Sequence, residues 1–479
     1  MTDWTITTLA GAIRAGRISP VEATREFLGR IERLDGRLRA FITVDATGAL
    51  RRARDLERDA MAGRWHGPLH GVPLAHKDLF RIAPLPTSCG TKTAEYFVAE
   101  RDATAVTRLA EAGAITLGKL NMAELAMGPY GDNAHHGDVQ NPWRLGHVSG
   151  GSSSGSGAAV AAGLALGALG TDTGGSIRLP AGCCGIAGLK PTYGRVSRAG
   201  GMALSWSMDH IGPMARTTRD VALLLEVIAG ADPDDSTASA RPVDAYLAGL
   251  ERPIRGLRVA LADNYYFDGV APEVARAVAD MGAVLEGLGA RVAPLRLPDP
   301  QVIHDVSGIV ARAESAVVHT RILRERPHEL QPAVRARLEV GERVTAHDYL
   351  QALRLRARLA REFIGEVFAE ADLVLAPVTP TPAPSLAEAT AGDGEAIAAR
   401  MGRFSRLTRP WNGLGLPVLA LPCGFSPTGL PIGAQLVGRP FDEATVLAVG
   451  HAYEQAAGWY RRRPDLGGAD AAPGQRASE

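Results

Sequence analysis

The chain has 479 residues, of which 46% are hydrophobic and 22% charged, and its 52 basic side chains balance its 52 acidic ones. This composition is typical of a packed globular protein and excludes a mainly disordered chain. Without an excess of positive charge, the chain lacks the electrostatic footprint of a nucleic-acid-binding protein, and we expect no nucleic acid among its partners.

The sequence contains no segment that predicts membrane insertion or secretion. Residues 1–16 lack a basic stretch followed by an apolar one, and the longest run of Ala, Gly, Leu and Val, 158–170, is too short to cross a bilayer. We therefore expect no membrane contact and a cytoplasmic location. The four cysteines form no metal-like CxxC pair, and we expect buried thiols at Cys89, Cys183, Cys184 and Cys423.

The first half of the chain alternates helical and strand patterns. Apolar spacing predicts helices within 5–60, with Ser19 as a helix cap, and again at 103–112. Short apolar runs predict strands at the start of 72–80 and at 114–120, and the small residues of 158–170 predict a buried helix. Such alternation predicts an α/β fold with a mixed, largely parallel central sheet covered by helices on both faces.

The second half continues the pattern. It predicts a β-α-β unit at 255–297, helices over 305–370, a buried strand from 372, two strands at 415–425 and 429–439, and a helix at 443–457. We expect one domain over 1–479, without a convincing internal boundary. Its expected parts are an N-terminal helical region (5–60), a catalytic core (65–220), a more variable substrate-side region (230–400) and a frayed tail (461–479).

Lysine is scarce and clustered. Of the 52 basic residues only four are lysines, Lys77, Lys92, Lys119 and Lys190, and all lie between residues 77 and 190. Arginine carries charge but cannot give up its proton in a protein, so a position that needs a neutral amine must keep lysine. Lys77 follows the apolar run VPLAH and is a candidate for burial, which lowers the pKa of an amine.

Two glycine-rich loops carry candidate nucleophiles. They span 149–157 (SGGSSSGSG) and 171–178 (TDTGGSIR). A serine nucleophile needs an exposed tight turn and nearby backbone N–H groups for the oxyanion, which the second loop can supply around Ser176. The turn alone equally allows Ser176 to be a helix cap. His135 and His136, with nearby aspartates, favour a solvated loop over a metal site, so we expect no metal and no cofactor.

At this point a family resemblance becomes evident. GGSSSGSGAAVAAG followed by GTDTGGSIRLPAGCCGIAGLKPTYGRVS closely resembles the core of the amidase signature family. HGVPLAHKDLF resembles the segment that carries the family lysine, and NPWR, GLPVLALPCGF and GLPIGAQLVG resemble further family segments. The resemblance covers about residues 5–460 in the family order, which makes chance similarity very improbable.

The resemblance implies roles for individual residues. Ser176 matches the nucleophile that forms the acyl-enzyme, Ser152 the bridging serine that the family holds through a cis peptide, and Lys77 the base that drives the proton relay. One residue departs from the commoner loop GGSSGGS, because Ser154 stands where that loop has glycine. The other implied positions are oxyanion N–H groups at Thr173, Gly174 and Gly175, a brace formed by Asp172 and Arg178, and a substrate pocket at Met127, Gly128 and Ser153.

Other interpretations fit parts of the sequence. The stretch 151–155 matches a G-x-S-x-G nucleophile elbow centred on Ser153, but no buried strand precedes it as that motif requires. The same loop is not a P-loop, because it lacks the Lys-Ser/Thr ending of that motif. The chain also resembles the amidase subunit of the complex that amidates misacylated tRNA. That subunit typically carries an aspartate for glutamine recognition where this chain has Ser405, so we expect a stand-alone hydrolase. A catalytically silent binding module is the remaining alternative.

The resemblance implies hydrolysis of a small-molecule carboxylic amide to an acid and an amine or ammonia. A carbamate, urethane or aryl ester could be cleaved by the same three residues. We expect specificity to come from 121–140, 305–350 and 380–412, and the arginine-rich helices near 321–361 to be solvated faces rather than a carboxylate clamp. A homodimer is expected from the resemblance alone.

Overall fold

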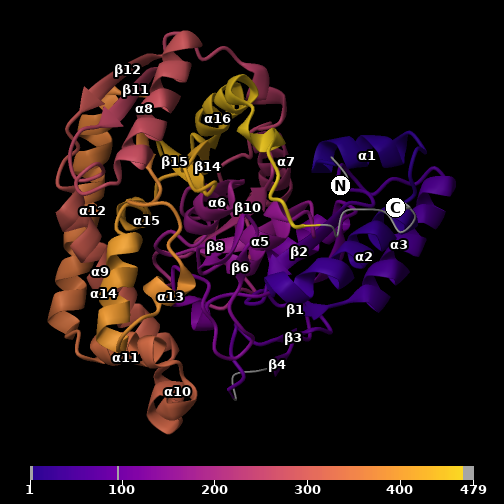
Figure 1. Cartoon of the computed structure of the whole chain (residues 1–479), viewed down its shortest axis with the longest axis horizontal. Helices are drawn as coiled ribbons and strands as arrows, with labels where there is room; N and C mark the ends of the chain where they lie inside the picture. Colours follow the sequence, from indigo (N-terminus) through magenta and orange to yellow (C-terminus); the bar gives the residue numbers. More distant parts are fainter. Residues whose placement is uncertain (1–3, 94–96, 468–479) are drawn as a thin grey trace, which may run out of the picture.

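The computed structural model describes residues 4–93 and 97–467 and contains an eleven-stranded sheet around which the helices are arranged (Figure 1). The strand order is β1-β5-β2-β8-β10-β9-β14-β15-β13-β11-β12, and two small ladders, β3-β4 and β6-β7, lie outside this sheet. The strands are β1 (Phe41–Val44), β2 (Pro73–Lys77), β3 (Pro86–Thr87), β4 (Phe97–Val98), β5 (Ile115–Leu120), β6 (Gln140–Asn141), β7 (Arg144–Val148), β8 (Gly167–Asp172), β9 (Ala187–Lys190), β10 (His210–Ala215), β11 (Arg258–Ala262), β12 (Arg291–Leu295), β13 (Leu373–Pro377), β14 (Val418–Phe425) and β15 (Pro431–Gly438).

The α/β class and the mixed sheet are confirmed, but the expectation of a largely parallel sheet is wrong. Among the described strands of the large sheet, four neighbouring pairs are parallel and six are antiparallel. The parallel pairs lie toward the two ends of the sheet, where helices connect the strands. The centre, β8-β10-β9-β14-β15, is antiparallel throughout.

Helices cover both faces of the sheet. In Figure 1 the first three helices lie on one side of the molecule, and the long helices α9, α11, α12 and α14 lie on the opposite side. The helices are α1 (Ile6–Arg14), α2 (Pro20–Leu38), α3 (Ala46–Met61), α4 (Thr104–Glu111), α5 (Ser154–Ala161), α6 (Arg178–Cys184), α7 (Thr218–Ile228), α8 (Pro272–Gly287), α9 (Pro300–Val318), α10 (Thr320–Glu325), α11 (Pro332–Glu342), α12 (Ala346–Glu370), α13 (Leu386–Ala389), α14 (Gly394–Phe404), α15 (Arg409–Gly413) and α16 (Glu443–Ala457), with 3₁₀ turns η1 (Glu124–Ala126), η2 (Ala248–Glu251), η3 (Pro327–Glu329) and η4 (Trp459–Arg461).

The N-terminal region is helical as predicted, with one strand that the sequence did not reveal. Ser19 caps α2 and forms a capping box with Glu22, and Pro20 occupies the first helical turn. Between α2 and α3 the strand β1 pairs with the edge of β5. Four residues are too few to show a period, so this strand could not be separated from the helical pattern around it.

The small-residue segment after the first glycine loop is only partly helical. Helix α5 ends at Ala161, Gly163 adopts a left-handed φ of 66°, and the chain turns back as β8. The prediction of one helix over 158–170 is therefore wrong beyond Ala161. Ala and Gly suit this strand because its neighbours approach closely: a side chain on Gly167 would come within 2.9 Å of atoms of Ile6 and Leu224. Helix and strand share this composition, so periodicity could not distinguish them.

The remaining predicted elements are confirmed. The 255–297 unit is β11-α8-β12, the 415–439 pair is the β14-β15 hairpin, and 443–457 is α16. The tail differs from expectation, because Leu466 is 3% exposed and its carbonyl accepts a hydrogen bond of 2.9 Å from Arg37. Residues 468–479 of the predicted frayed segment lie outside the described residues.

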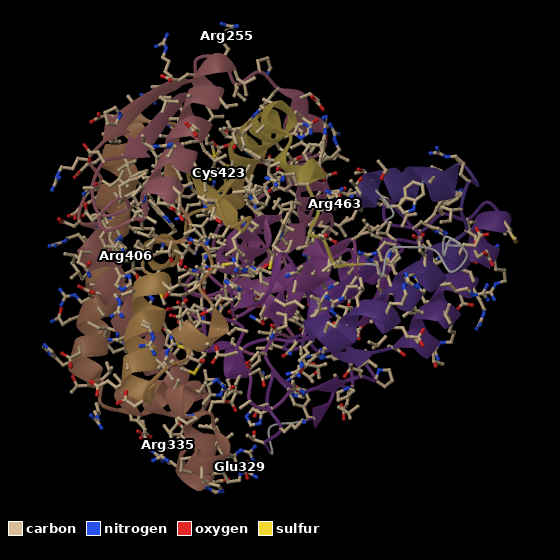
Figure 2. The ribbon with its side chains drawn as sticks, in the orientation of Figure 1. Arg255, Glu329, Arg335, Arg406, Cys423 and Arg463 are labelled. Carbon is tan, nitrogen blue, oxygen red and sulfur yellow. The ribbon has the colours of Figure 1, made fainter. Side chains whose placement is uncertain are left out.

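Side chains fill the space between these layers, including Cys423, which is buried at the end of β14 (Figure 2). A second, smaller core is centred on the fully buried Trp411, which stacks on Tyr266 at a centroid distance of 4.9 Å and packs edge-on against Phe363. This second core ties α9, α12 and α15 to the sheet. None of the described helices is long and apolar enough to cross a membrane.

Candidate active site

Lys77 ends strand β2 in the interior of the protein. Its side chain is fully buried, and its Nζ donates hydrogen bonds of 2.8 Å to Ser152 Oγ and 2.8 Å to Thr171 Oγ1. Both partners are hydroxyls, and no ion pair of Lys77 with a carboxylate is found in the described part of the chain. The amine therefore has hydrogen-bond acceptors but no direct counter-charge.

Burial lowers the pKa of Lys77 to about 7, because the charged ammonium loses its hydration while the carboxylates of Asp172 and Asp209 only partly offset that loss. The other two buried lysines show the same direction. Lys119 forms an ion pair of 2.9 Å with Asp78, whereas Lys190 donates to the Pro191 carbonyl. Only Lys77 combines a pKa near neutrality with a hydrogen bond to a candidate bridging serine.

Ser152 lies in the first glycine-rich loop, after a cis peptide bond that joins it to Gly151. Its side chain is fully buried and accepts the hydrogen bond from Lys77. The backbone N–H of the following Ser153 donates to the carbonyl of Ser176 at 3.2 Å. This bond holds the two predicted serine loops side by side.

Ser176 lies in the turn between β8 and α6, half-buried rather than enclosed. In the described structure, no acceptor is found for the backbone N–H groups of Thr173, Gly174 or Ser176 itself. Gly175 differs from the prediction, because its N–H donates to Asp172 Oδ1 at 2.8 Å and is not available to an oxyanion here. The free amides of this turn therefore include that of Ser176, which the motif alone did not single out.

Gly175 is required for steric reasons instead. Its φ of 133° belongs to the region that favours glycine, and a Cβ there would collide with the Thr408 hydroxyl. That hydroxyl donates to the Gly174 carbonyl at 2.6 Å, so Thr408 fixes the turn from the opposite side.

Asp172 and Arg178 bracket the turn as predicted, and both are fully buried. Arg178 makes a two-pronged contact with the Asp172 carboxylate at 3.0 Å from both Nε and Nη2. Asn412 donates to Asp172 Oδ1 at 2.8 Å, and Arg178 also reaches Gln435 Oε1 at 3.1 Å. Although burial acts in the opposite direction, Arg178 holds the pKa of Asp172 well below its usual range. The buried ion pair of Asp172 and Arg178 therefore holds the turn in place.

The ion pair of Asp172 and Arg178 gives a testable prediction for stability. Replacing Arg178 by Met leaves a buried, unpaired carboxylate at Asp172, and we expect the free energy of unfolding to fall by about 3–5 kcal/mol. The exposed Arg358, which pairs with Glu362 one helical turn away, is the matched control; R358M is expected to cost less than about 0.5 kcal/mol. Chemical denaturation curves of the two variants measure both values, and equal shifts would contradict the assigned role.

The predicted pocket residues behave differently from one another. Ser153 is fully buried, donates to the Thr171 carbonyl and accepts from the Thr171 N–H, both at 3.2 Å. The prediction that it contacts substrate is therefore wrong, since both roles of its hydroxyl are taken by β8. Met127 does line a cavity. Gly128 supports the first loop, because a side chain on Gly151 would collide with the Gly128 carbonyl.

The cavity beside this site has a volume of about 580 Å³. All three segments predicted to carry specificity contribute to it, from the Met127 loop, from α9 and α11, and from α14 with the start of α15. Arg337 of α11 is half-buried there, with its Nη1 donating to the Met127 carbonyl at 3.1 Å. We expected the arginines of 321–361 to lie on solvent-exposed helix faces, and this is wrong for Arg337. The spacing of residues along a helix could not show which face of α11 meets the cavity.

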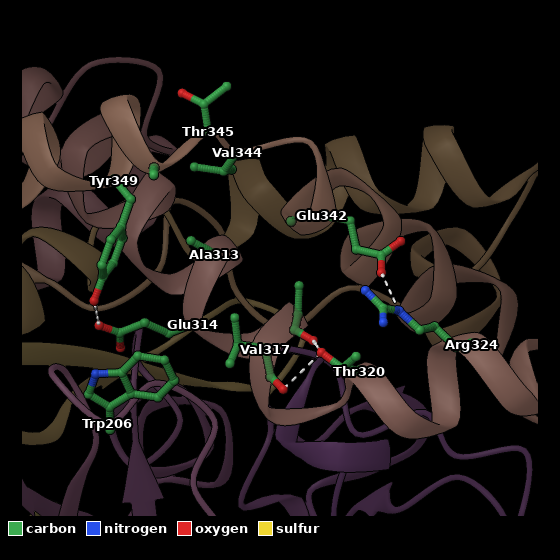
Figure 3. A pocket seen from close by; sticks show the side chains of 13 residues that line it. Trp206, Ala313, Glu314, Val317, Thr320, Arg324, Glu342, Val344, Thr345 and Tyr349 are labelled. Atoms are coloured by element: carbon green, nitrogen blue, oxygen red, sulfur yellow. Dashed lines mark hydrogen bonds and ion pairs between the residues drawn. The ribbon is translucent and has the colours of Figure 1, made fainter.

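A second pocket, of about 370 Å³, lies among α9, α10, the end of α11 and the start of α12 (Figure 3). Tyr349 Oη donates to Glu314 Oε1 at 2.8 Å at one end, and Arg324 pairs with Glu342 at the other. Its charged groups are paired, and none of its lining residues belongs to the two serine loops.

The other predicted candidates have structural partners. His135 contacts Glu124 at 2.6 Å, and no group of three or more His, Cys, Asp or Glu side chains suited to a metal occurs among the described residues. All four cysteines are buried. Burial raises the pKa of Cys183 to about 12, which leaves it protonated and unreactive at neutral pH.

Two residues at the site were missed by sequence reasoning. Thr171 accepts from Lys77, and Asp209 accepts from the Thr173 hydroxyl and from the backbone N–H groups of Leu204 and Ser205. Burial raises the pKa of Asp209 to about 6, although these donors oppose the shift. Thr171 precedes the turn in the same motif and could have been suspected. Asp209 reaches the site only through the pairing of β10 with β8.

Comparison with known proteins agrees with this geometry. The family model described as Amidase matches residues 22–447. A curated relative, the A subunit of the glutamyl-tRNA(Gln) amidotransferase of Roseiflexus sp. (strain RS-1), is 43% identical and covers 95% of this chain and 96% of its own. The solved peptide amidase of Stenotrophomonas maltophilia has a TM-score of 0.84 at 31% identity, covering 97% and 98% of the two chains. A structure described as a vestigial protein complex that reveals the origins of an s-triazine catabolic enzyme has a TM-score of 0.88 at 34% identity, covering 95% and 99%.

The relatives overturn the expectations about partners. Relatives from several bacteria, 39–43% identical, are named as the A subunit of an amidotransferase for glutamyl-tRNA(Gln). The predictions of a stand-alone protein and of no nucleic-acid partner are therefore wrong as drawn. Net charge was a poor guide, because one subunit of an assembly need not carry the charge that meets the RNA.

Proposed function

Because this chain belongs to the amidase signature family and is an enzyme that acts on carbon–nitrogen bonds, we propose that it hydrolyses a carboxylic amide through an acyl-enzyme on Ser176. The contact of 2.8 Å between Lys77 Nζ and Ser152 Oγ, in a fully buried setting, carries this proposal. The amine has a pKa of about 7, so an appreciable fraction is neutral at physiological pH and can accept a proton.

The proposed reaction begins with a relay of two protons. Lys77 takes the hydroxyl proton of Ser152 while Ser152 takes that of Ser176, whose oxygen attacks the amide carbon. The negative charge that develops on the carbonyl oxygen is stabilised by the free N–H groups of Thr173, Gly174 and Ser176. This set replaces the predicted one, in which Gly175 took part.

The relay then runs in reverse. The proton on Lys77 returns through Ser152 to the leaving nitrogen, the C–N bond breaks, and an amine or ammonia departs. Water enters, gives its proton to the same relay and attacks the ester of Ser176, which releases the acid and restores the free serine. Asp172, Arg178 and Thr408 act by positioning the turn and not by touching the substrate.

We further propose that the chain works as the A-type subunit of a tRNA-dependent amidotransferase, in which the released ammonia amidates a tRNA-bound glutamyl group. The relatives of that name match it over 94–98% of its length, which supports this assembly over the free small-molecule amidase that the sequence favoured. The balanced charge of the chain is consistent with another subunit holding the tRNA.

Isotope transfer tests this proposal. The native assembly is purified from its own cells and given glutamyl-tRNA(Gln) with glutamine labelled with ¹⁵N in its side-chain amide. We expect the label in glutaminyl-tRNA, and none when the chain carries S176A. Release of labelled ammonia without transfer would contradict the amidotransferase role and leave the hydrolytic mechanism intact.

A further inference from the structure

Asp209 is a buried carboxylate beside the reactive turn that the proposed reaction does not use. It immediately precedes β10, and Thr173 immediately follows β8. The antiparallel pairing of β10 with β8 sets His210 opposite Asp172, and it therefore places Asp209 next to the first residue of the turn. The Asp209 side chain is almost fully buried, so water competes little for its hydrogen bonds.

The Asp209 carboxylate joins the turn to the segment 204–208 that precedes it. Its Oδ1 accepts the Thr173 hydroxyl at 2.5 Å, and its Oδ2 accepts the backbone N–H groups of Leu204 at 2.8 Å and Ser205 at 3.0 Å. Leu204 lines the cavity of about 580 Å³. Asp209 therefore connects one wall of this cavity to Thr173, whose N–H belongs to the proposed oxyanion site.

A second buried carboxylate, Glu314 of α9, holds the same segment from its other side. Glu314 Oε2 accepts the Ser205 hydroxyl and, at 3.1 Å, the Ser207 N–H. Its Oε1 accepts from Tyr349 Oη at 2.8 Å (Figure 3). The segment is thus fixed both by α9 and by the turn, which limits the positions that Asp209 can adopt.

Asp209 has no counter-charge in contact. Among the described residues, no Lys, Arg or His nitrogen lies within 4.0 Å of its carboxylate, and Arg198 acts on it only from beyond that distance. Burial raises the pKa of Asp209 to about 6, so most of it is ionised at neutral pH. Burial lowers the pKa of Lys77 to about 7, and the charges of Asp172 and Asp209 oppose this shift. Cys89 acts on Lys77 in the same direction as these two carboxylates.

We propose that Asp209 is a positioning residue of the reaction at Ser176. By accepting the Thr173 hydroxyl, it fixes the first residue of the turn so that the Thr173 N–H meets the carbonyl oxygen as negative charge develops there. Its own negative charge also stabilises the ammonium form of Lys77, which has to hold a proton until the leaving nitrogen takes it. This inference rests on the proposed hydrolysis and adds to it a residue that touches neither the substrate nor the reacting atoms.

Replacing Asp209 by Asn tests both effects, because the side chain keeps its size but loses its charge and one acceptor oxygen. Ammonia release from glutamine by the native assembly is measured against pH. In D209N we expect kcat to fall about 10- to 100-fold while KM changes less than about threefold. The fall of kcat/KM in acid should move to lower pH by about half a pH unit or more, because losing a nearby negative charge disfavours the ammonium form of Lys77.

Asp220 provides the matched control. It is also a buried carboxylate whose pKa is raised by burial, and it accepts the N–H groups of Ile6 and Thr7 at 3.0 Å. It belongs to α7 and binds the start of α1 instead of the turn. We expect D220N to lower the unfolding midpoint as D209N does, but to leave kcat and the pH profile native. If D209N behaved like D220N, the inference would be overturned.

Thr173 supplies a second variant, which keeps the test decisive if D209N does not fold. T173V retains the shape of the side chain and loses the hydroxyl, and we expect kcat to fall about tenfold or more. T173S should recover most of that loss. In the D209N background T173V should have no further effect on kcat, because both changes break one contact. A native kcat in T173V, or losses that multiply in the double variant, would contradict the assigned role.

Modification of Ser176 by phenylmethylsulfonyl fluoride separates this inference from the proposed hydrolysis, because it needs no turnover of an amide. If the assembly cleaves no amide, the proposed hydrolysis fails. The pH dependence of the modification rate should nevertheless shift to lower pH in D209N and stay native in D220N. A modification profile that D209N leaves unchanged would overturn the role of Asp209.

Discussion

Replacing Ser176 by Ala is expected to lower kcat by a factor of about 10⁴ or more, because no other described side chain in the turn between β8 and α6 can take over as nucleophile. Substrate binding should persist, since the cavity beside the turn is untouched. Ammonia release measures the loss. The exposed Ser236, replaced by Ala, is the matched control and is expected to leave kcat at the native value.

A covalent probe locates the nucleophile directly. Phenylmethylsulfonyl fluoride should modify Ser176 at pH 8 and leave the S176A protein unmodified. Trypsin cuts after Arg144 and Arg178, so one peptide carries both Ser152 and Ser176, and fragment-ion spectra have to separate them. An adduct on Ser152 would exchange the two proposed roles, and one on a cysteine would contradict the mechanism.

Replacing Lys77 by Arg is expected to lower kcat/KM by about 10³-fold, because a guanidinium cannot act as a neutral base and is too large for the fully buried site. The exposed Lys92 offers the matched exchange, and K92R should behave like the native enzyme. Full activity in K77R would exclude the relay. Circular dichroism and the unfolding midpoint show whether the variant is folded, and K77M, which keeps a similar length without charge, separates loss of the base from steric damage.

The dependence of kcat/KM on pH tests whether Lys77 acts in its neutral form. The pKa of this amine is lowered to about 7, so the neutral base is lost as pH falls through that value. In the native enzyme, kcat/KM should fall about tenfold per pH unit below pH 6 and level off above pH 8. An amine of ordinary pKa, near 10.5, would instead give a profile that still rises at pH 9.

Local patterns were sufficient for much of the fold. Amphipathic spacing and caps predicted α2, α8 and α16, and the turn residues of 426–429 predicted the β14-β15 hairpin. They failed where a segment is short, as in β1, or made of residues that suit helix and strand equally, as in β8. The antiparallel centre of the sheet could not be predicted, because strand direction depends on the path of the connections and not on the strand sequence.

The candidate site, like the fold, was predicted only in part from local sequence patterns. Its motifs predicted Lys77, Ser152 and Ser176, yet adjacent residues of one motif proved to have different roles. Ser153 and Gly175 stand beside the proposed catalytic serines but are used for structure, since their hydroxyl and amide already have partners in β8 and at Asp172. Sequence adjacency cannot show which polar groups are already satisfied.

By itself, therefore, the sequence determined the family, the main helices and strands, and the residue types of a serine–serine–lysine relay, since these depend on composition and spacing along the chain. Only the tertiary structure decided that the side chain of Lys77 is fully buried and that Asp209 accepts a hydrogen bond from Thr173 in the turn. It also brought residues of α9, α11, α14 and α15 together around one cavity. The physical reason is that burial, pKa and unbalanced charge depend on which distant segments pack together.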